Sequence, residues 1–164
     1  MTEAGTTDRA KLARSAAIAS ITVALILVAL KSWASWRTGS TAMLGSLADS
    51  ALDLIASIAT LTGVWIASMP ADEDHRFGHG KAEALAAIFQ VMLIAVSAFG
   101  IAARALSQLA GGTQTAAAGE GIAVSTVAIV LTFALLGWQR YVMNRTRSLA
   151  IQTDHLHYKS DLLL

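Results

Sequence analysis

Apolar residues occur in long runs along this chain, and short polar stretches separate the runs. A helix of about 20 apolar residues crosses the ~30 Å hydrocarbon core of a membrane, because each residue adds ~1.5 Å. The runs predict helices over about residues 14–36, 41–68, 82–109 and 121–141, and a fifth that starts near residue 148. Since the chain ends inside that last apolar turn, we expect an all-α fold: a membrane-spanning helical bundle of about five transmembrane helices, with the fifth truncated.

The residues before the first apolar run are polar and mixed in charge. We expect residues 1–13 to form a short, exposed cytoplasmic tail without a fold, and residues 14–164 to form the transmembrane domain. A secretory signal peptide is the alternative interpretation of the first run. The acidic residues Glu3 and Asp8 fit poorly with a basic leader, and the run continues past Lys31 toward further spans, so a membrane span is favoured.

Two aspartates interrupt the second apolar run. Asp49 and Asp53 are four residues apart, so their side chains share one helical face, and both lie deep within the predicted span. A carboxylate in the hydrocarbon core costs at least a few kcal/mol, and a second one nearby costs more. A soluble amphipathic helix would explain the pair as a solvated stripe, but no broad polar face accompanies it. The pair therefore predicts a bound counter-charge, for which a divalent cation is suitable.

The fifth helix carries a matching pair. His157 and Asp161 are also four residues apart, and counting along antiparallel helices places them at the depths of Asp53 and Asp49, respectively. Three carboxylates and one imidazole are oxygen and nitrogen donors that suit tetrahedral Zn²⁺ or a similar transition metal better than Ca²⁺ or Mg²⁺. A histidine satisfied by a backbone carbonyl is the alternative for His157. The two pairs together predict one metal site between the second and fifth spans.

Further acidic and histidine side chains lie outside these two pairs. His155 does not share the face of the pair on the fifth helix, and we interpret it, with Asp154, as a boundary or lining residue without an assigned role. The polar loop after the second span contains Asp72, His75 and His79. Nearby glycines argue against a helix there, so the spacing of the histidines carries little information. A solvated interfacial loop and a peripheral metal site both remain open.

Composition supports a membrane protein and excludes some chemistry. Hydrophobic residues make up 55% of the chain and charged residues 14%, with a mean hydropathy of +0.57. The formal net charge of +1 gives no support for a nucleic-acid partner. Without cysteine, the chain has no thiolate metal site and no disulfide. Abundant alanine, serine and glycine suit close helix packing in membrane lipid.

The distribution of basic residues predicts the orientation. If the amino end is cytoplasmic, that side collects most of the lysines and arginines. They are Arg9, Lys11, Arg14, Arg76, Lys81, Arg140, Arg145 and Arg147. The opposite side has only Arg37, with Lys31 and Arg104 within reach. The positive-inside rule therefore places the N-terminus in the cytoplasm.

Several motifs in the chain match one known family. They are R-T-G-S, D-S-A-L-D from Asp49, P-A-D-E-D-H-R-F-G-H-G-K-A-E from Pro70, and H-Y-K-S-D from His157. On these motifs the chain resembles the cation diffusion facilitators, most closely the bacterial zinc and iron efflux proteins. The resemblance is dense over residues 31–83 and again over 154–161.

The resemblance implies two metal sites. The family's transported-ion site falls on Asp49, Asp53, His157 and Asp161, and its loop site falls on Asp72, His75 and His79. Lys81 and Glu83 match charges at the entry to the third span of the family. Members have six spans, a soluble metal-binding domain after the last one, and a dimeric assembly. The resemblance thus implies that this chain is the incomplete N-terminal portion of a homodimeric protein, without the sixth span and the C-terminal cytoplasmic domain.

The resemblance also implies a function: zinc-type cation efflux across a bacterial inner (plasma) membrane. Zn²⁺ is the expected cargo, although Cd²⁺, Fe²⁺, Co²⁺ and Mn²⁺ accept the same ligands. Protons are the expected counter-ion, because they compete with metal for carboxylates and imidazole. An enzyme is not expected: a membrane metalloenzyme would need an open metal position, and four protein ligands leave none. A non-transporting scaffold or assembly fragment remains an alternative.

Overall fold

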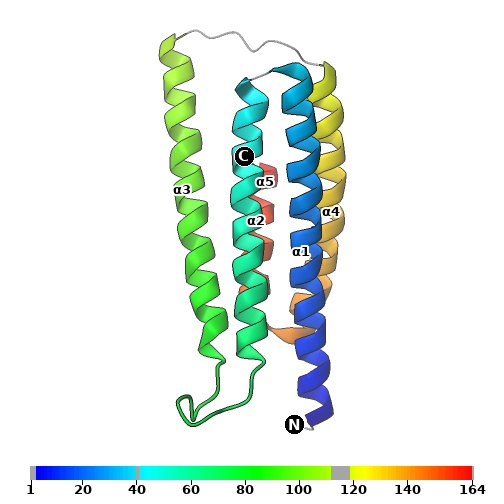
Figure 1. Cartoon of the computed structure of the whole chain (residues 1–164), viewed down its shortest axis with the longest axis vertical. Helices are drawn as coiled ribbons and strands as arrows, with labels where there is room; N and C mark the ends of the chain where they lie inside the picture. The colour runs from blue at the N-terminus through cyan, green and yellow to red at the C-terminus, as the bar shows by residue number, and fades with distance from the viewer. Residues whose placement is uncertain (1–2, 40, 112–118, 164) are drawn as a thin grey trace.

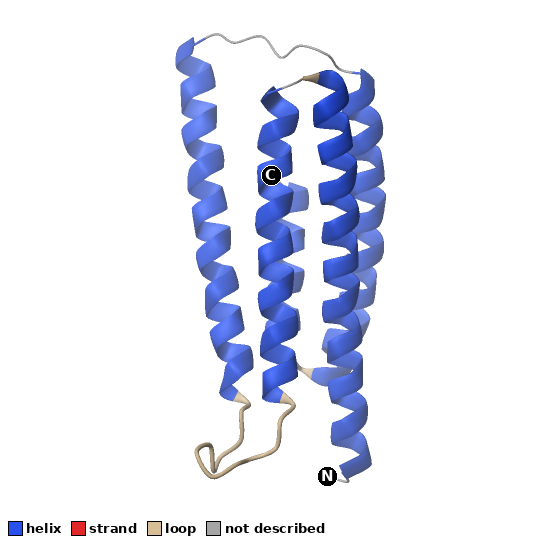
Figure 2. Cartoon of the chain, viewed as in Figure 1, coloured by secondary structure: helices blue, strands red, loops and turns tan. Residues whose placement is uncertain are grey.

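The protein is a bundle of long helices in a computed structural model that describes residues 3–39, 41–111 and 119–163 (Figure 1). The helices are α1 (Glu3–Thr38), α2 (Thr41–Ala67), α3 (Lys81–Gly111), α4 (Gly119–Thr146) and α5 (Leu149–Leu163). Figure 2 shows no strand in the described part of the chain. The prediction of an all-α fold with five helices is therefore confirmed.

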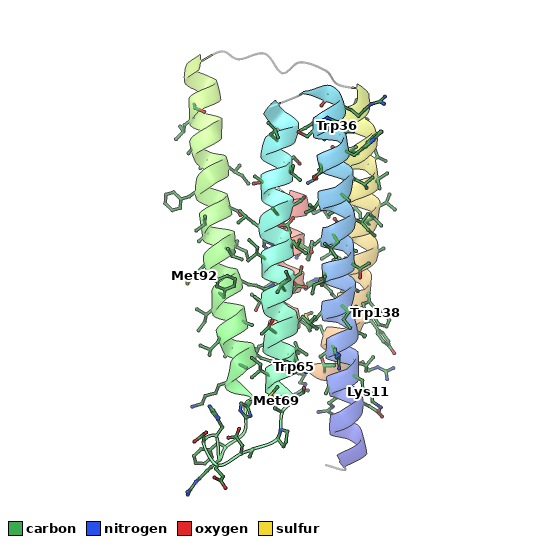
Figure 3. All side chains as sticks on the ribbon, in the orientation of Figure 1. Lys11, Trp36, Trp65, Met69, Met92 and Trp138 are labelled. Atoms are coloured by element: carbon green, nitrogen blue, oxygen red, sulfur yellow. The ribbon has the colours of Figure 1, made fainter. Side chains whose placement is uncertain are left out.

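In the part of the chain that the structure describes, four helices are long and apolar enough to cross a membrane. The qualifying stretches are Asp8–Thr38, Met43–Ala67, Lys81–Ala103 and Ile122–Thr146. The fifth helix, α5, has 15 residues. Large apolar side chains of α3 are exposed: Phe99 is 81% exposed, and Met92, which is labelled in Figure 3, is 58% exposed. This exposed apolar surface suits contact with lipid and agrees with an integral membrane protein.

The shortest helix occupies the centre of the arrangement. Helix α5 contacts all four of the others, α1 packs between α2 and α4, and α3 packs against α2 and α5. The N-terminal end of α1, the loop between α2 and α3, and the connection between α4 and α5 lie at one end of the bundle (Figure 1). We call this the amino end and the opposite one the far end. The chain thus runs up and down, as the sequence indicated.

A glycine closes the tight connection between α1 and α2. Gly39 has a φ of 62°, in the left-handed region that residues with a Cβ rarely adopt, and its amide donates to the carbonyl of Ser35 at 2.9 Å. This ends α1 at the expected R-T-G-S motif. The other connection expected near the far end, residues 111–120, falls mostly on 112–118, which lie outside the described residues.

Small residues let the helices approach closely. At Gly63 of α2, an added Cβ would lie 2.5 Å from the Cβ of Ala86 in α3, so any side chain larger than hydrogen would collide. Alanine also dominates the buried core, which suits association of helices in lipid, where close packing replaces burial from water. The buried alanines are Ala13, Ala16, Ala17, Ala24, Ala34, Ala56, Ala86 and Ala150.

The N-terminal segment differs from the sequence expectation. We expected residues 1–13 to lack a fold, but α1 begins at Glu3 and continues without a break into the membrane-spanning part. Ala13 is only 4% exposed and Leu12 packs against the core cluster, which also contains Val142 and Ile151. The expectation was wrong because apolar side chains at Leu12 and Ala13 find a packing surface on other helices, which a reading of local polarity cannot anticipate.

Candidate metal centre

Three of the four expected ligands converge between α2 and α5. The Nε2 atom of His157 lies 3.0 Å from Oδ1 of Asp53 and 3.7 Å from Oδ2 of Asp161. One potential ligand atom from each of these residues lies within 4.8 Å of the others. Metal–ligand bonds of ~2.0–2.2 Å would be reached by small side-chain movements toward a common centre.

Burial differs across these three side chains. His157 is 1% exposed, Asp53 is 14% exposed and Asp161 is 36% exposed. The cluster therefore has a closed side at His157 and an open side at Asp161. A cavity of ≈ 130 Å³ lies on the open side, lined by residues that include Asp53, Asp161, Thr132 and Tyr158. An ion could reach the carboxylate oxygens through this cavity.

Asp49 stands apart from the convergent group. It lies one helical turn from Asp53 on the same face of α2 and is partly buried. It is not among the residues whose ligand atoms come within 4.8 Å of one another. Asp161, which we expected at the level of Asp49, instead groups with Asp53. The structure thus brings together Asp53, His157 and Asp161 and leaves Asp49 at the edge.

A lysine within the first span also faces this region, and the sequence pattern did not predict a role for it at the site. The ammonium of Lys31 donates to Oγ of Ser50 at 2.7 Å and to the carbonyl of Ser46 at 3.2 Å, both on α2. Lys31 also lines the cavity beside Asp53 and Asp161. A charge inside a membrane span is a functional candidate by default, so its position in the first apolar run was the available signal.

Asp154 is the second residue whose place in the structure was not predicted from the sequence. It is fully buried and not at a boundary. Its carboxylate accepts hydrogen bonds from Ser20 of α1 at 2.5 Å, from Gln90 of α3 at 2.7 Å and from Gln139 of α4 at 2.6 Å. One side chain of α5 is therefore tied to three other helices. Polar residues inside the apolar runs, such as Gln90 and Gln139, were the signal that could have indicated it.

A tyrosine extends these contacts to the remaining helix. The hydroxyl of Tyr158 lies 3.0 Å from Oγ of Ser57 on α2 and donates to the carbonyl of Ser20 on α1 at 3.3 Å. Tyr158 follows His157 directly, so these contacts fix the rotation of α5 at the metal ligands. The buried polar contacts position the imidazole toward Asp53.

The first turn of α5 is anchored by a carboxylate from α3. Oε2 of Glu83 accepts from the hydroxyl of Ser148 at 2.9 Å and from the amide of Leu149 at 3.0 Å. The first amides of a helix lack partners within the helix, and a carboxylate there also interacts favourably with the helix dipole. Glu83 thus anchors the N-terminus of α5, the helix that carries His157 and Asp161.

The loop between α2 and α3 contains a second cluster. The Nδ1 atom of His75 lies 3.2 Å from Oδ1 of Asp72, and Nε2 of His79 lies 3.4 Å from Oδ2 of Asp72. One ligand atom from each of the three lies within 4.8 Å of the others. The side chains of Asp72 and His75 are more than half exposed. The loop therefore brings together all three residues expected there, at a surface open to water.

Backbone geometry keeps the loop carboxylate ionised. The amide of His75 donates to Oδ1 of Asp72 at 2.6 Å, and this hydrogen bond lowers the pKa of Asp72. The side-chain hydrogen bond from His75 lowers the pKa of Asp72 further. An ionised carboxylate beside two imidazoles is a set of oxygen and nitrogen donors that suits a transition metal ion.

Comparison with known proteins relates this arrangement to cation transport. A family model described as the cation efflux transmembrane domain matches residues 17–164. The chain is 42% identical over 154 residues to the cation-efflux pump FieF of Klebsiella pneumoniae, covering 94% of this chain and 51% of the pump. It is 41% identical over 154 residues to the cation-efflux pumps FieF of Escherichia coli and Salmonella arizonae, with the same coverage. The chain spans about half the length of these curated relatives.

These relatives are named as pumps, which are transporters and not enzymes. The match to the family model extends from the first span through α5 and includes every residue of both clusters. The chain belongs to the cation efflux family, the cation diffusion facilitators.

Proposed function

We propose that this chain is the ion-conducting membrane part of a divalent metal cation efflux transporter of the zinc type. The convergence of Asp53, His157 and Asp161 inside a membrane bundle is the observation that carries the proposal. Carboxylates at this depth require a counter-charge, and the mixed oxygen and nitrogen donors favour Zn²⁺. Asp49, one turn away on the same face, would complete a tetrahedral set after a modest side-chain movement. Cd²⁺, Fe²⁺, Co²⁺ and Mn²⁺ accept the same ligands.

Protons are the proposed counter-ion. Metal binding requires ionised carboxylates and a neutral imidazole, so protons and metal compete for the same atoms. If the site opens to the two sides of the membrane in turn, metal leaving on one side is replaced by protons that return on the other. No covalent step is required.

The loop cluster is proposed as a second metal site, formed by Asp72, His75 and His79. Its exposure at the amino end of the bundle supports a role in binding cytoplasmic metal ahead of transport. This placement rests on a cytoplasmic N-terminus, which the excess of lysine and arginine at that end supports. A homodimer in the bacterial inner membrane is proposed by analogy with the family.

Metal-binding calorimetry tests the principal site. We expect the purified chain in detergent to bind Zn²⁺ more tightly at pH 8 than at pH 5.5, because protons displace the metal. The chain carries His75→Ala and His79→Ala at both pH values, so that the loop cluster does not contribute to the measured Zn²⁺ binding. Alanine at Asp49, Asp53, His157 and Asp161 together should abolish the remaining binding. Equal binding by the quadruple variant would overturn the assignment.

Cargo preference is tested in the same format. Titrations with Zn²⁺, Cd²⁺, Fe²⁺ and Mn²⁺ give the order of affinities, which we expect Zn²⁺ and Cd²⁺ to lead because imidazole is a better ligand for them than for Mn²⁺. Metal flux into vesicles that contain a full-length relative carrying this membrane region then distinguishes a transporter from a scaffold. Binding without any flux would favour the scaffold.

A further inference from the structure

Lys31 is a half-buried cation inside the first membrane span, and it is not one of the expected metal ligands. Two oxygen atoms of α2 hold its ammonium, Oγ of Ser50 at 2.7 Å and the carbonyl of Ser46 at 3.2 Å. It forms no ion pair within 4.0 Å in the described part of the chain. The ammonium is therefore held beside the acidic cluster without occupying a ligand position.

Lys31 nevertheless interacts electrostatically with the site. The carboxylates that interact with its ammonium are those of Asp53, Asp49 and Asp161. The side chain also lines the ≈ 130 Å³ cavity that Asp53 and Asp161 line. A lysine that interacts with three carboxylates contributes to the charge that an incoming ion meets, even without direct contact.

The charges of Lys31 and of the carboxylates that interact with it add up to a value that matches one class of ion. Asp49, Asp53 and Asp161 carry three negative charges when ionised, and Lys31 offsets one of them. With a neutral His157, the group has a net charge of about −2. Asp154 is not counted, because it is not among the carboxylates that interact with Lys31 and its oxygens are occupied by donors from three other helices. One divalent cation would neutralise the group.

We propose that Lys31 determines the charge selectivity of the site, by making it complementary to a divalent cation. This inference rests on the proposed transport function. In a setting of low dielectric constant, a net charge left over after binding is costly. A monovalent ion would leave a negative charge and a trivalent ion a positive one. Without Lys31 the group would carry three negative charges, and a trivalent ion would become the neutralising one.

The hydrogen bonds of Lys31 give the ammonium a fixed place in this balance. Ser46 and Ser50 lie on the same helix as Asp49 and Asp53, one on each side of Asp49 in sequence. A lysine tethered to α2 keeps its distance from the α2 carboxylates as the helices move. The compensation would therefore persist in every state of the transport cycle in which α1 and α2 stay together.

Competition between a divalent and a trivalent ion tests the proposal. The probes are Cd²⁺ and Tb³⁺, titrated at one pH into the purified chain carrying His75→Ala and His79→Ala. Lys31→Gln removes the charge and keeps a hydrogen-bond donor, and Lys31→Met removes both. We expect each to raise the ratio of Tb³⁺ affinity to Cd²⁺ affinity by about tenfold relative to the unsubstituted lysine. Comparing variants cancels the different coordination preferences of the two ions.

Two controls isolate the charge at this position. Lys31→Arg keeps the charge, so its affinity ratio should stay close to that of the lysine. Lys159→Met removes an equal charge from an exposed position on α5, and it should also leave the ratio unchanged. Helical circular dichroism and a single elution peak show which variants are folded. Two folded neutral variants with a ratio within twofold of the lysine would overturn the proposal.

The outcome also separates this inference from the proposed function. If Asp53→Ala in the same background binds Cd²⁺ as well as the aspartate does, the metal site itself has been assigned to the wrong place. If Asp53→Ala loses binding while the neutral Lys31 variants keep the original ratio, the site stands and only the role of Lys31 fails. A raised ratio in Lys159→Met equal to that in Lys31→Met would also overturn the role, because any lost charge would then suffice.

Discussion

The two aspartates of α2 have unequal positions, and their substitution should have unequal effects. Asp53 contacts His157 at 3.0 Å, whereas Asp49 lies outside the convergent group. We expect Asp53→Asn to weaken Zn²⁺ binding by more than about 100-fold and Asp49→Asn by about 10- to 100-fold, the range typical of residues that support a metal ligand. Calorimetry on the two isosteric variants, in a chain without the loop histidines, measures the difference. A larger loss for Asp49→Asn would show that the ion sits one turn closer to the far end.

Mild acid should not release metal from the loop by protonating its aspartate. The backbone amide of His75 lowers the pKa of Asp72, so this carboxylate stays ionised to lower pH than an ordinary aspartate. Loss of Zn²⁺ between pH 8 and about 5 is then not caused by protonation of this carboxylate. We expect Asp72→Asn, in an Asp53→Ala background, to lower loop affinity at every pH without moving the midpoint. A midpoint shifted by more than one pH unit would contradict this.

At the level of single residues, the spacing of polar residues along a helix predicted which of them share a face. It did not predict which residues of other helices they contact. Four-residue spacing correctly put His157 and Asp161 on one face of α5, and that face meets Asp53. Spacing could not indicate that Asp154, three residues before His157, is fully buried among polar side chains. The position of Lys31 beside the carboxylates also depends on the rotation of α1 against α2, which periodicity within one helix leaves undetermined.

The N-terminal turn of α5 is anchored by a residue of α3, so a substitution in α3 should weaken the metal site. Glu83→Gln removes the charge that accepts from Ser148 and Leu149. We expect a cost of about 1 kcal/mol at this helix terminus, seen as faster hydrogen exchange in the first turn of α5 and a Zn²⁺ affinity lower by up to about fivefold. Glu73→Gln, an exposed change in the loop, is the matched control. Unchanged exchange in α5 would show that Glu83 is dispensable as an anchor.

The contact between α2 and α3 should tolerate no side chain at Gly63. Its added Cβ would lie 2.5 Å from Ala86 and 3.1 Å from the carbonyl of Ala82, so Gly63→Ala must push the helices apart. We expect a loss of about 1–3 kcal/mol in the free energy of unfolding. Gly137→Ala in α4 meets nothing within 4 Å and should be neutral or stabilising, because alanine favours helix. Thermal unfolding in detergent compares the two; equal melting temperatures would contradict the close approach.

At the level of elements, hydrophobic periodicity predicted helix type and approximate position. The predicted 41–68 and the observed Thr41–Ala67 of α2 differ by a single residue at one end. The larger difference is at Glu3, where α1 begins well before the expected residue 14. A polar segment that continues an established helix needs no apolar run of its own, since propagation costs less than nucleation. Local hydropathy therefore underestimates helices that project beyond a membrane.

Labelling of single cysteines tests the orientation of the whole molecule. The native chain has no cysteine, so each introduced one is unique. We expect Glu73→Cys, in the loop at the amino end, to react with an impermeant thiol reagent only from the cytoplasmic side. Trp36→Cys replaces a side chain that is 86% exposed at the far end, and it should react only from the opposite side. The reversed pattern would invert the orientation and, with it, the direction of transport that we propose.

The arrangement of helices around α5 was not available from the sequence. The up-and-down order follows from short connections, but the order of helices around the bundle does not, because each apolar helix surface could face either lipid or protein. Polar residues within the spans, such as Gln90 and Gln139, determine that order. Their pairing with Asp154 selects which faces turn inward, and such pairing is visible only once the helices are assembled.

The contacts of Asp154 and Tyr158 tie five helices together at one level of the bundle. Ser20, Gln90 and Gln139 connect α1, α3 and α4 to Asp154, and Ser57 connects α2 through Tyr158. Above this level, toward the far end, lie the cavity and the more exposed Asp161. If the helices tilt, the layer held together by Asp154 and Tyr158 would stay in place, and the ends of the helices beyond it would move apart. Ion release on that side would then need only a small change of tilt, and α5 would not have to turn about its own axis.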